Sequence, residues 1–388
     1  MATKKKKKKN TNLTKQLSQI DYWMMQYEDD LVLLENADLY TLLSTYKEML
    51  ESDETVTAAV DFLVHAVLAT ILDYTHPDPE IEDFVNQNFV GMEGTLHDVF
   101  RVALKDGVVF GFHTSEIVYE YRDGKLYLKR FVRLDPTITR FLVDKYGNLQ
   151  GVRVYSTNQV DIPIGKIFVF SHNSGGSLYG ESRLKRAYRA WIFKKYAMRW
   201  WAVALEKFGI PPVVGKTTKS NTEELLNVLK NFYCKASLVV SRDDEVDLLE
   251  SRRNIGDTFE QAIVRADKMI FRSFLLPGLL ADEGRVGSYA LGRIHLDIFF
   301  ISVKWLAEEL TSAFVERVVR PLLEYNGYTN LNNWGRFTIL NEPSAEEKWR
   351  LAQAFFQLTS IGILNPEKDS KWMRDMLRFP NPDEKEGV

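Results

Sequence analysis

The segment GIPPVVGKTTK, from Gly209 to Lys219, contains a Gly-Lys-Thr sequence that could bind a phosphate group. A Walker A loop has four residues between its first glycine and Gly-Lys-Ser/Thr, and it connects a strand to a helix so that backbone N–H groups surround the phosphate. Here five residues separate Gly209 from Gly215, two of them are prolines without an N–H group, and a helix is expected before the segment. The spacing therefore argues against nucleotide binding, and a nucleotide-dependent enzyme is kept only as a weak alternative.

Other residues that could support catalysis are also poorly arranged. In SLVVSRDDE, Ser241 and Arg242 separate the apolar run from Asp243, so this carboxylate does not lie where it would hold magnesium. The six histidines are scattered, and the single cysteine, Cys234, cannot form a CxxC metal site. We therefore predict no cofactor, no metal site and no enzymatic activity.

Composition indicates a globular chain with little overall charge. The 388 residues are 45% hydrophobic, which is enough for a large core and for two or three domains. The net charge is −3, so any contact with nucleic acid must be local or weak. The longest apolar stretches are interrupted by charged residues, and the lysine run at residues 4–9 is followed by polar residues, so we expect neither a membrane span nor a signal peptide. Residues 1–30 are expected to form a mobile basic arm.

The first half of the chain predicts helices followed by an antiparallel sheet. A helix is expected from a cap near Asp53 to Leu72, where HPDPE should end it, and another from Leu96 to Lys105, ending at Asp106-Gly107. Alternating sequences around Asp123-Gly124 and around residues 146–148 predict two hairpins, and IPIGKIFVFS predicts one further strand. These strands are expected to form one sheet.

A long helix with two distinct faces is predicted from Ser182 to Phe208. One face should carry an apolar stripe that includes Trp191 and Trp201, while basic residues, Lys194 among them, populate the rest. The tryptophans could belong either to the core of the chain or to an interface between copies, and both alternatives stay open.

The remainder predicts a small insert and more helices. After Pro211-Pro212 we expect a strand at residues 212–214, a helix at 222–232, a strand at 236–240 and an acidic turn SRDDEVDLLES. A helix follows from Asp257 to Leu275, then a glycine-rich loop, then a long helix from Ser288 that is too apolar on all sides to stand in solvent. A strand, GRFTIL, and a C-terminal helical tail complete the chain.

This order of elements, α+β sheet, long helix, small insert, second helix, glycine-rich loop and third helix, resembles that of tailed-bacteriophage portal proteins, in particular the Mu-type portal family. Four segments carry the resemblance: GFHTSEIVYEY, FVRLDPTITRF, SLYGESRLKRAYRAWIFKKYAMRWWAVALEKFGIPPVVGK and DEGRVGSYALGRIHLDIF. The resemblance implies an α+β portal-type fold whose parts are a wing (31–180 and 289–343), stem helices (181–208 and 253–278), a clip (209–252), a tunnel loop (279–288) and a crown-like helical tail (344–388).

The resemblance also implies roles for particular residues. A tunnel loop facing DNA would contain Asp282, Glu283, Gly284, Arg285, Gly287 and Ser288. A clip surface that docks a motor or adaptor would contain Lys216, Lys219, Asp243, Asp244 and Glu245, although the acidic residues could equally form a solvated turn. A stem interface between subunits would contain Arg186, Arg189, Trp191 and Trp201.

The implied assembly is a ring, usually of twelve copies, at one vertex of a capsid. Its partners would be double-stranded DNA bound without sequence specificity, a terminase motor, the major capsid protein and a neck or tail adaptor, with no membrane. The chain would be assembled in the host cytoplasm and would reside in the virion. Another structural head or neck protein that is not a conduit remains an alternative.

Overall fold

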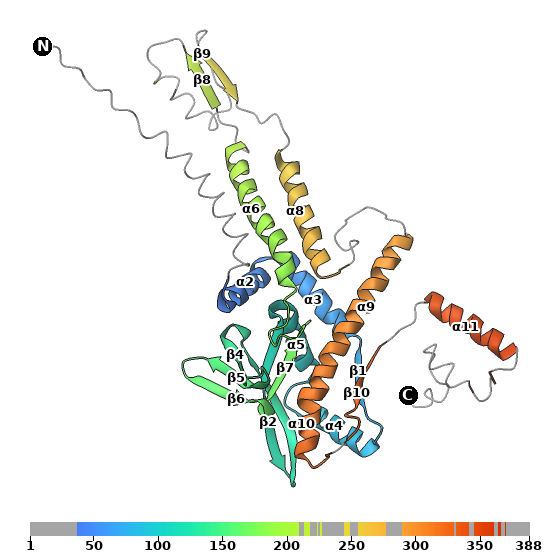
Figure 1. Ribbon diagram of the computed structural model, residues 1–388. Helices are drawn as coiled ribbons and strands as arrows, with labels where there is room; N and C mark the ends of the chain where they lie inside the picture. The colour runs from blue at the N-terminus through green and yellow to red at the C-terminus, as the bar shows by residue number, and fades with distance from the viewer. Residues whose placement is uncertain are drawn as a thin grey trace.

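The computed structural model has an α+β fold, as expected (Figure 1). It describes residues 37–208, 213–217, 244–248, 255–276, 289–329, 331–340 and 345–360, together with residues 223, 226, 364, 365 and 369. The expected basic arm at residues 1–30, most of the insert and the whole glycine-rich loop lie outside the described residues.

The centre of the body is a three-stranded antiparallel sheet in the order β3-β2-β7. Strand β2 pairs with both neighbours; the strands are β2 (Phe112–Arg122), β3 (Lys125–Leu134) and β7 (Ile167–Ser171). The predicted hairpin at Asp123-Gly124 is confirmed, and both turn residues have positive φ, 52° and 79°, as a two-residue hairpin turn requires.

A second three-stranded sheet stands beside the first, so the prediction of a single sheet was wrong. It has the order β4-β5-β6, from β4 (Thr139–Val143), β5 (Leu149–Tyr155) and β6 (Gln159–Pro163). The hairpin between β4 and β5 is confirmed. IPIGKIFVFS was expected to be one strand, but β6 ends at Pro163 and a short 3-10 turn precedes β7. A second, small apolar cluster joins the two sheets, because it combines Val152 and its neighbours in β5 and β6 with residues of β3 and β7.

Helices cover the central sheet and form the main core with it. They are α2 (Leu39–Ser52), α3 (Glu54–Leu68), α4 (Pro79–Gly91), α5 (Leu96–Phe110) and α9 (Tyr289–Phe314). The ring of Phe314 lies at the middle of this core, with ring centroids 4.9 to 6.0 Å from those of five other phenylalanines: Phe89, Phe100, Phe131, Phe168 and Phe337. Aromatic rings therefore join segments that are more than 200 residues apart.

Three boundaries predicted for this region were wrong. Helix α3 ends at Leu68 instead of Leu72, because the following residues form strand β1 (Ile71–Thr75), which pairs with the distant β10 (Arg336–Ile339). HPDPE begins helix α4 instead of ending a helix, since the Asp78 side chain accepts a hydrogen bond from Glu80 N and Pro79 occupies the first turn. Helix α5 continues past residue 107 to Phe110 and ends at Gly111, which is left-handed.

The helix that begins as α9 continues beyond Phe314, where its hydrogen-bonding pattern changes. A five-residue π-helical turn (Val315–Val319) leads into α10 (Arg320–Tyr325). Pro321 has no N–H group to donate to the preceding turn, and a wider turn accommodates this loss. The predicted continuity of this helix is thus confirmed, with a π-helical segment before the proline.

Two helices project from the body as an antiparallel pair (Figure 1). Helix α6 (Leu184–Phe208) leads away from the body and α8 (Ile255–Ser273) returns beside it. At the far end lies a two-stranded antiparallel sheet of β8 (Val213–Thr217) and β9 (Asp244–Leu248). Helix α11 (Ala345–Ser360) lies apart from the body on the side of α9. Both helices of the pair were predicted to within two residues.

Candidate functional site

The base of α6 is attached to the body by a polar loop. Ser182 Oγ donates a hydrogen bond to the Val109 carbonyl of α5 and accepts one from Leu184 N. In the same loop, His172 Nδ1 lies 2.8 Å from a carboxylate oxygen of Glu309 in α9, and Asn173 N donates to the other oxygen at 2.6 Å. The beginning of the projecting helix is thereby held by two core helices.

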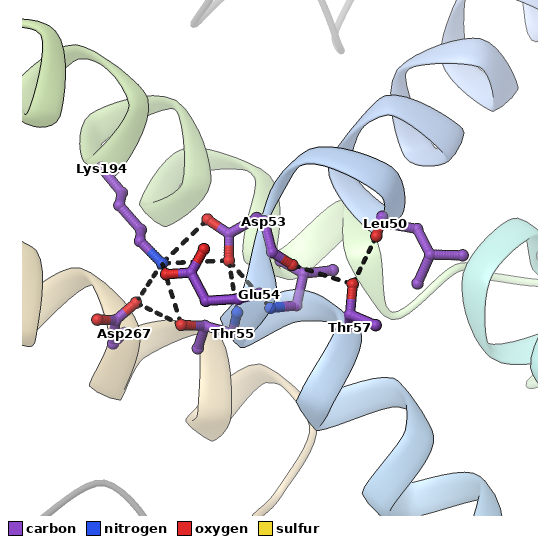
Figure 2. A network of polar contacts seen from close by, with 8 residues as sticks. Leu50, Asp53, Glu54, Thr55, Thr57, Lys194 and Asp267 are labelled. Carbon is purple, nitrogen blue, oxygen red and sulfur yellow. Dashed lines mark hydrogen bonds and ion pairs between the residues drawn. The ribbon is translucent and has the colours of Figure 1, made fainter.

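A buried lysine joins the projecting pair to helix α3 (Figure 2). The side chain of Lys194 is 1% exposed, and its Nζ lies 3.1 Å from Asp53 Oδ2, 2.9 Å from Glu54 Oε1 and 2.8 Å from Asp267 Oδ1. It also donates to Thr55 Oγ1 at 3.0 Å, and Thr55 Oγ1 donates to Asp267 at 2.8 Å. We call this cluster of Lys194, Asp53, Glu54, Thr55 and Asp267 the Lys194 network; it connects α6, α3 and α8 at one point.

The same network completes the N-terminal cap of α3. Asp53 Oδ1 accepts hydrogen bonds from the backbone N–H groups of Thr55 at 2.9 Å and Val56 at 3.0 Å. A capping carboxylate also interacts favourably with the positive end of the helix dipole. Asp53 therefore contacts both the start of α3 and the ammonium group of Lys194.

Electrostatics keep Lys194 charged despite its burial. Burial alone would lower the pKa of Lys194, but hydrogen bonds to Asp267 and Glu54 and the charge of Asp53 outweigh it, so that the pKa lies above its ordinary value. The hydrogen bond from Lys194 in turn lowers the pKa of Glu54, whose side chain is 75% exposed. One ammonium group thus faces three carboxylates at the base of the pair.

Lys194 was predicted to lie on the basic face of α6, and this prediction was wrong. Lys194 lies on the buried face together with Ala187, Trp191 and Ala197. Its spacing from Ala187 and Trp191, seven and three residues, was a signal that could have identified it, since residues at these spacings share one helix face.

The four residues predicted for a subunit interface lie in different environments. Trp191 is 3% exposed and packs in the core of its own chain, which supports the intramolecular alternative for this residue and corrects its assignment to the interface. Trp201 is partly exposed and stacks on Phe259 of α8, with ring centroids 6.5 Å apart. Arg186 and Arg189 are exposed on α6, and Arg186 forms an ion pair with Glu181 of the same chain at 3.2 Å.

Apolar side chains are exposed along the helix pair and on α9. On the pair they are Met198 and Leu205 of α6 and Val264 and Met269 of α8, exposed by 41% to 57%. On α9, Trp305 is 72% exposed. Among the described residues, the helix that the sequence predicted to be too apolar for solvent is thus exposed on one side.

The Gly-Lys-Thr sequence lies in a strand and does not form a phosphate-binding loop. Gly215, Lys216 and Thr217 pair with Val246, Glu245 and Asp244 of β9. Backbone groups of a paired strand are used by the partner strand, and β8 does not open a helix, so the rejected Walker A interpretation stays rejected.

The acidic segment of the insert also differs from its prediction. Asp244 and Glu245 belong to strand β9 and not to a turn, and Glu245 is opposite Lys216 in the register. Lys219 and Asp243 lie outside the described residues, as do all six residues predicted for the tunnel loop: Asp282, Glu283, Gly284, Arg285, Gly287 and Ser288.

Among the described residues, no group of three or more acidic, histidine or cysteine side chains is placed to bind a metal ion. In this part of the chain, none of the helices combines the length and apolarity that crossing a bilayer requires.

Comparisons with known proteins agree with this architecture. The family model described as portal protein of Mu bacteriophage matches residues 43–379. The chain is 25% identical over 205 residues to the Mu-like prophage FluMu protein gp29 of Haemophilus influenzae, which covers 51% of this chain and 38% of that protein. It is 25% identical over 196 residues to the portal protein of Escherichia phage Mu, covering 49% and 38% respectively. The alignments thus span less than half the length of these two relatives.

Solved structures show the same fold at low sequence identity. A chain in the virion of a native gene transfer agent particle has a TM-score of 0.63 at 12% identity, covering 87% of this chain and 93% of that one. A chain in the neck of the native particle, computed with C12 symmetry, has a TM-score of 0.62 at 12% identity and the same coverage. Since the family match includes the body, the projecting pair and α11, this chain belongs to the portal protein family of Mu bacteriophage.

Proposed function

We propose that this chain is the subunit of a ring-shaped portal at a capsid vertex, through which double-stranded DNA passes into and out of the head. The observation that carries the proposal is the family match over residues 43–379, which extends from α2 to beyond α11. In this proposal the body is the wing, the α6–α8 pair is the stem, the β8–β9 end is the clip, residues 279–288 are the tunnel loop and residues 344–388 are the crown.

The apolar side chains left exposed in the single chain support a ring. Trp305 on α9 and Met198 and Leu205 on α6 lie on surfaces that a subunit would bury against its neighbours. The proposed copy number is twelve, which is supported by the C12 symmetry used for the neck of the related particle.

The near-neutral charge of the chain suits passage of DNA. Each phosphate that a basic side chain neutralises adds affinity through counterion release, so a strongly basic bore would retard the duplex. With a net charge of −3, contact is expected to be weak and independent of sequence. We propose that Arg285 makes this contact. In the sequence it follows the acidic pair Asp282 and Glu283 and precedes Gly287.

Each proposed partner would contact a different part of the subunit. The clip, with Lys216, Lys219, Asp243, Asp244 and Glu245, would dock the terminase motor during packaging and the neck or tail adaptor afterwards. The wing would contact the major capsid protein. The portal would be assembled in the host cytoplasm, would reside in the virion, and would act as a structural component without catalytic activity.

Electron microscopy of the purified chain tests the ring. End-on views should show a closed ring with an axial channel wide enough for duplex DNA. A chain that remains a 44.9 kDa monomer over a wide concentration range would contradict the proposal, and a ring without a continuous channel would favour a structural neck protein that is not a conduit.

An in-vitro packaging assay tests the tunnel loop. Arg285→Glu should lower packaging while leaving ring assembly unchanged, and Gly287→Pro should impair packaging by restricting the backbone of the loop. Lys145→Glu, which reverses an exposed charge at the tip of the second sheet, is the matched control. Normal packaging by both loop variants would remove this role from the loop.

A further inference from the structure

Helix α9 carries an exposed apolar stripe opposite its buried face. Ile298, Ile301 and Trp305 are 51%, 65% and 72% exposed, and their spacing of three and four residues places them on one side of the helix. The other side is packed in the core through four residues that are at most 2% exposed: Phe299, Val303, Leu306 and Leu310. We call the three exposed residues the α9 stripe; nothing among the described residues covers it.

Helix α11 carries a second uncovered apolar face. Trp349 and Phe356 are 62% and 77% exposed, and they are seven residues apart, close to two turns, so they share one face. Phe355, which points in another direction, is only 4% exposed. A 16-residue helix is marginally stable by itself, so a partner for the uncovered face would stabilise it.

We propose that the face of α11 with Trp349 and Phe356 docks on the α9 stripe of the neighbouring subunit. This inference rests on the proposed ring and specifies one of its contacts. A closed ring is built from a heterologous interface, in which two different surfaces of each subunit meet. The α9 stripe and the α11 face are two such surfaces, both are apolar, and both contain a tryptophan, a residue enriched at the cores of interfaces.

The geometry of the single chain indicates that α11 docks on α9 of a neighbouring subunit and not on α9 of its own chain. Ile339, at the end of β10, lines a common groove with Lys304 of α9. Helix α11 begins six residues after Ile339, a distance of at most about 20 Å when fully extended. The stripe of the same chain is therefore within reach, yet no described residue covers either face and α11 lies apart from α9 (Figure 1).

Cysteine crosslinking of the full chain tests this contact. In a Cys234→Ser background, Ile301→Cys and Phe356→Cys are prepared singly and together, rings are verified by electron microscopy, and a short bismaleimide is added. The double variant should give a ladder of covalent oligomers, and a mixture of the two single variants should give dimers. Ile298→Cys with Trp349→Cys repeats the test at a second pair, and Tyr121→Cys with Phe356→Cys is the control, because Tyr121 is 73% exposed at the distant tip of β2.

The possible outcomes distinguish failure of this contact from failure of the proposed ring. A crosslink only within single chains of the double variants would mean that α11 docks on its own α9, and it would overturn the inference. Rings that form normally but give no ladder with either pair would also overturn it, while leaving the proposed portal intact. Absence of rings from the parent chain would overturn both. A ladder with the Tyr121 control as strong as with the test pairs would show non-specific crosslinking and refute the contact.

Discussion

Substitution of Lys194 by methionine should destabilise the subunit more than its size suggests. Methionine keeps most of the apolar volume of lysine but removes the ammonium group, leaving Asp53 and Asp267, 6% and 26% exposed, without their cation. Breaking a buried ion pair in this way costs about 3–5 kcal/mol. Both carboxylates keep other donors, two backbone N–H groups for Asp53 and Thr55 Oγ1 for Asp267, so we expect a loss near the lower limit, about 3 kcal/mol.

The neighbouring residue provides a matched control. Lys195 is 49% exposed and its Nζ lies 2.7 Å from Glu48, which is 53% exposed, and 4.8 Å from the ring centroid of Trp191. An exposed ion pair of this kind contributes about 0.2–1 kcal/mol, so Lys195→Met should cost less than about 1 kcal/mol. Urea unfolding of both variants, at one protein concentration because assembly shifts apparent stability, measures the difference. Equal losses for the two variants would refute the role assigned to the Lys194 network.

Four further outcomes are expected. The pKa of Lys194 is raised by its carboxylate partners, so its contribution to the unfolding free energy is complete below the unfolded value of 10.5 and is lost as the pH rises through the folded value. As the pH rises above 10.5, the parent should therefore lose more stability than Lys194→Met. Gly180→Ala should lower the melting temperature strongly, because φ is +58° and a Cβ atom would overlap the carbonyl oxygens of Gly111 and His172. Tyr74→Phe removes a 2.6 Å hydrogen bond to the Trp334 carbonyl and should cost about 1 kcal/mol in urea unfolding. Trp305→Gln should change subunit stability by less than about 0.5 kcal/mol but reduce the ring fraction in sedimentation velocity.

The parts of the fold that the sequence predicted well are those specified by neighbouring residues. The Asp123-Gly124 hairpin depends on two residues that accept positive φ, and alternation in the flanking segments selects the strands. The ends of α6 and α8 were predicted to within two residues, because a double proline follows one and a glycine-rich segment follows the other. In each case, residues close in the sequence were sufficient to predict the turn or the end of the helix.

The wrong predictions concern features that depend on distant partners. Residues 71–75 continue an apolar helical pattern, and only their pairing with β10, more than 250 residues later, makes them a strand. Gly107 lies inside α5, where Phe170 of β7 packs closely against it and leaves no room for a side chain. Periodicity and turn signals carry no information about such contacts.

The candidate site was also predicted only in part, because the positions of its side chains depend on residues that are distant in the sequence. Trp191 and Trp201 follow one helical stripe in the sequence, but the first packs on the body and the second on α8, because α6 leaves the body partway along its length. The polarity of Lys194 suggested exposure, whereas its carboxylate partners come from two other helices. The apolar character of α9 was predicted, and its exposed stripe required the structure.

A charged network at the base of the α6–α8 pair has a consequence that an apolar contact would not have. Apolar packing can tolerate small sliding of helices, whereas ion-pair contacts of 2.8 to 3.1 Å from one ammonium nitrogen to two carboxylates at the start of α3 and one within α8 fix both distance and direction. Desolvation offsets much of the energy of such a network, so its contribution to stability alone is a weak reason for it. In the proposed ring, however, a change in the angle between the α6–α8 pair and the body would recur at every subunit, and it would alter the number of copies at which the ring closes. As a hypothesis for this chain, the Lys194 network sets that angle: Lys194→Met rings should show a broader distribution of diameters or copy numbers in electron microscopy than Lys195→Met rings, and identical distributions would refute it.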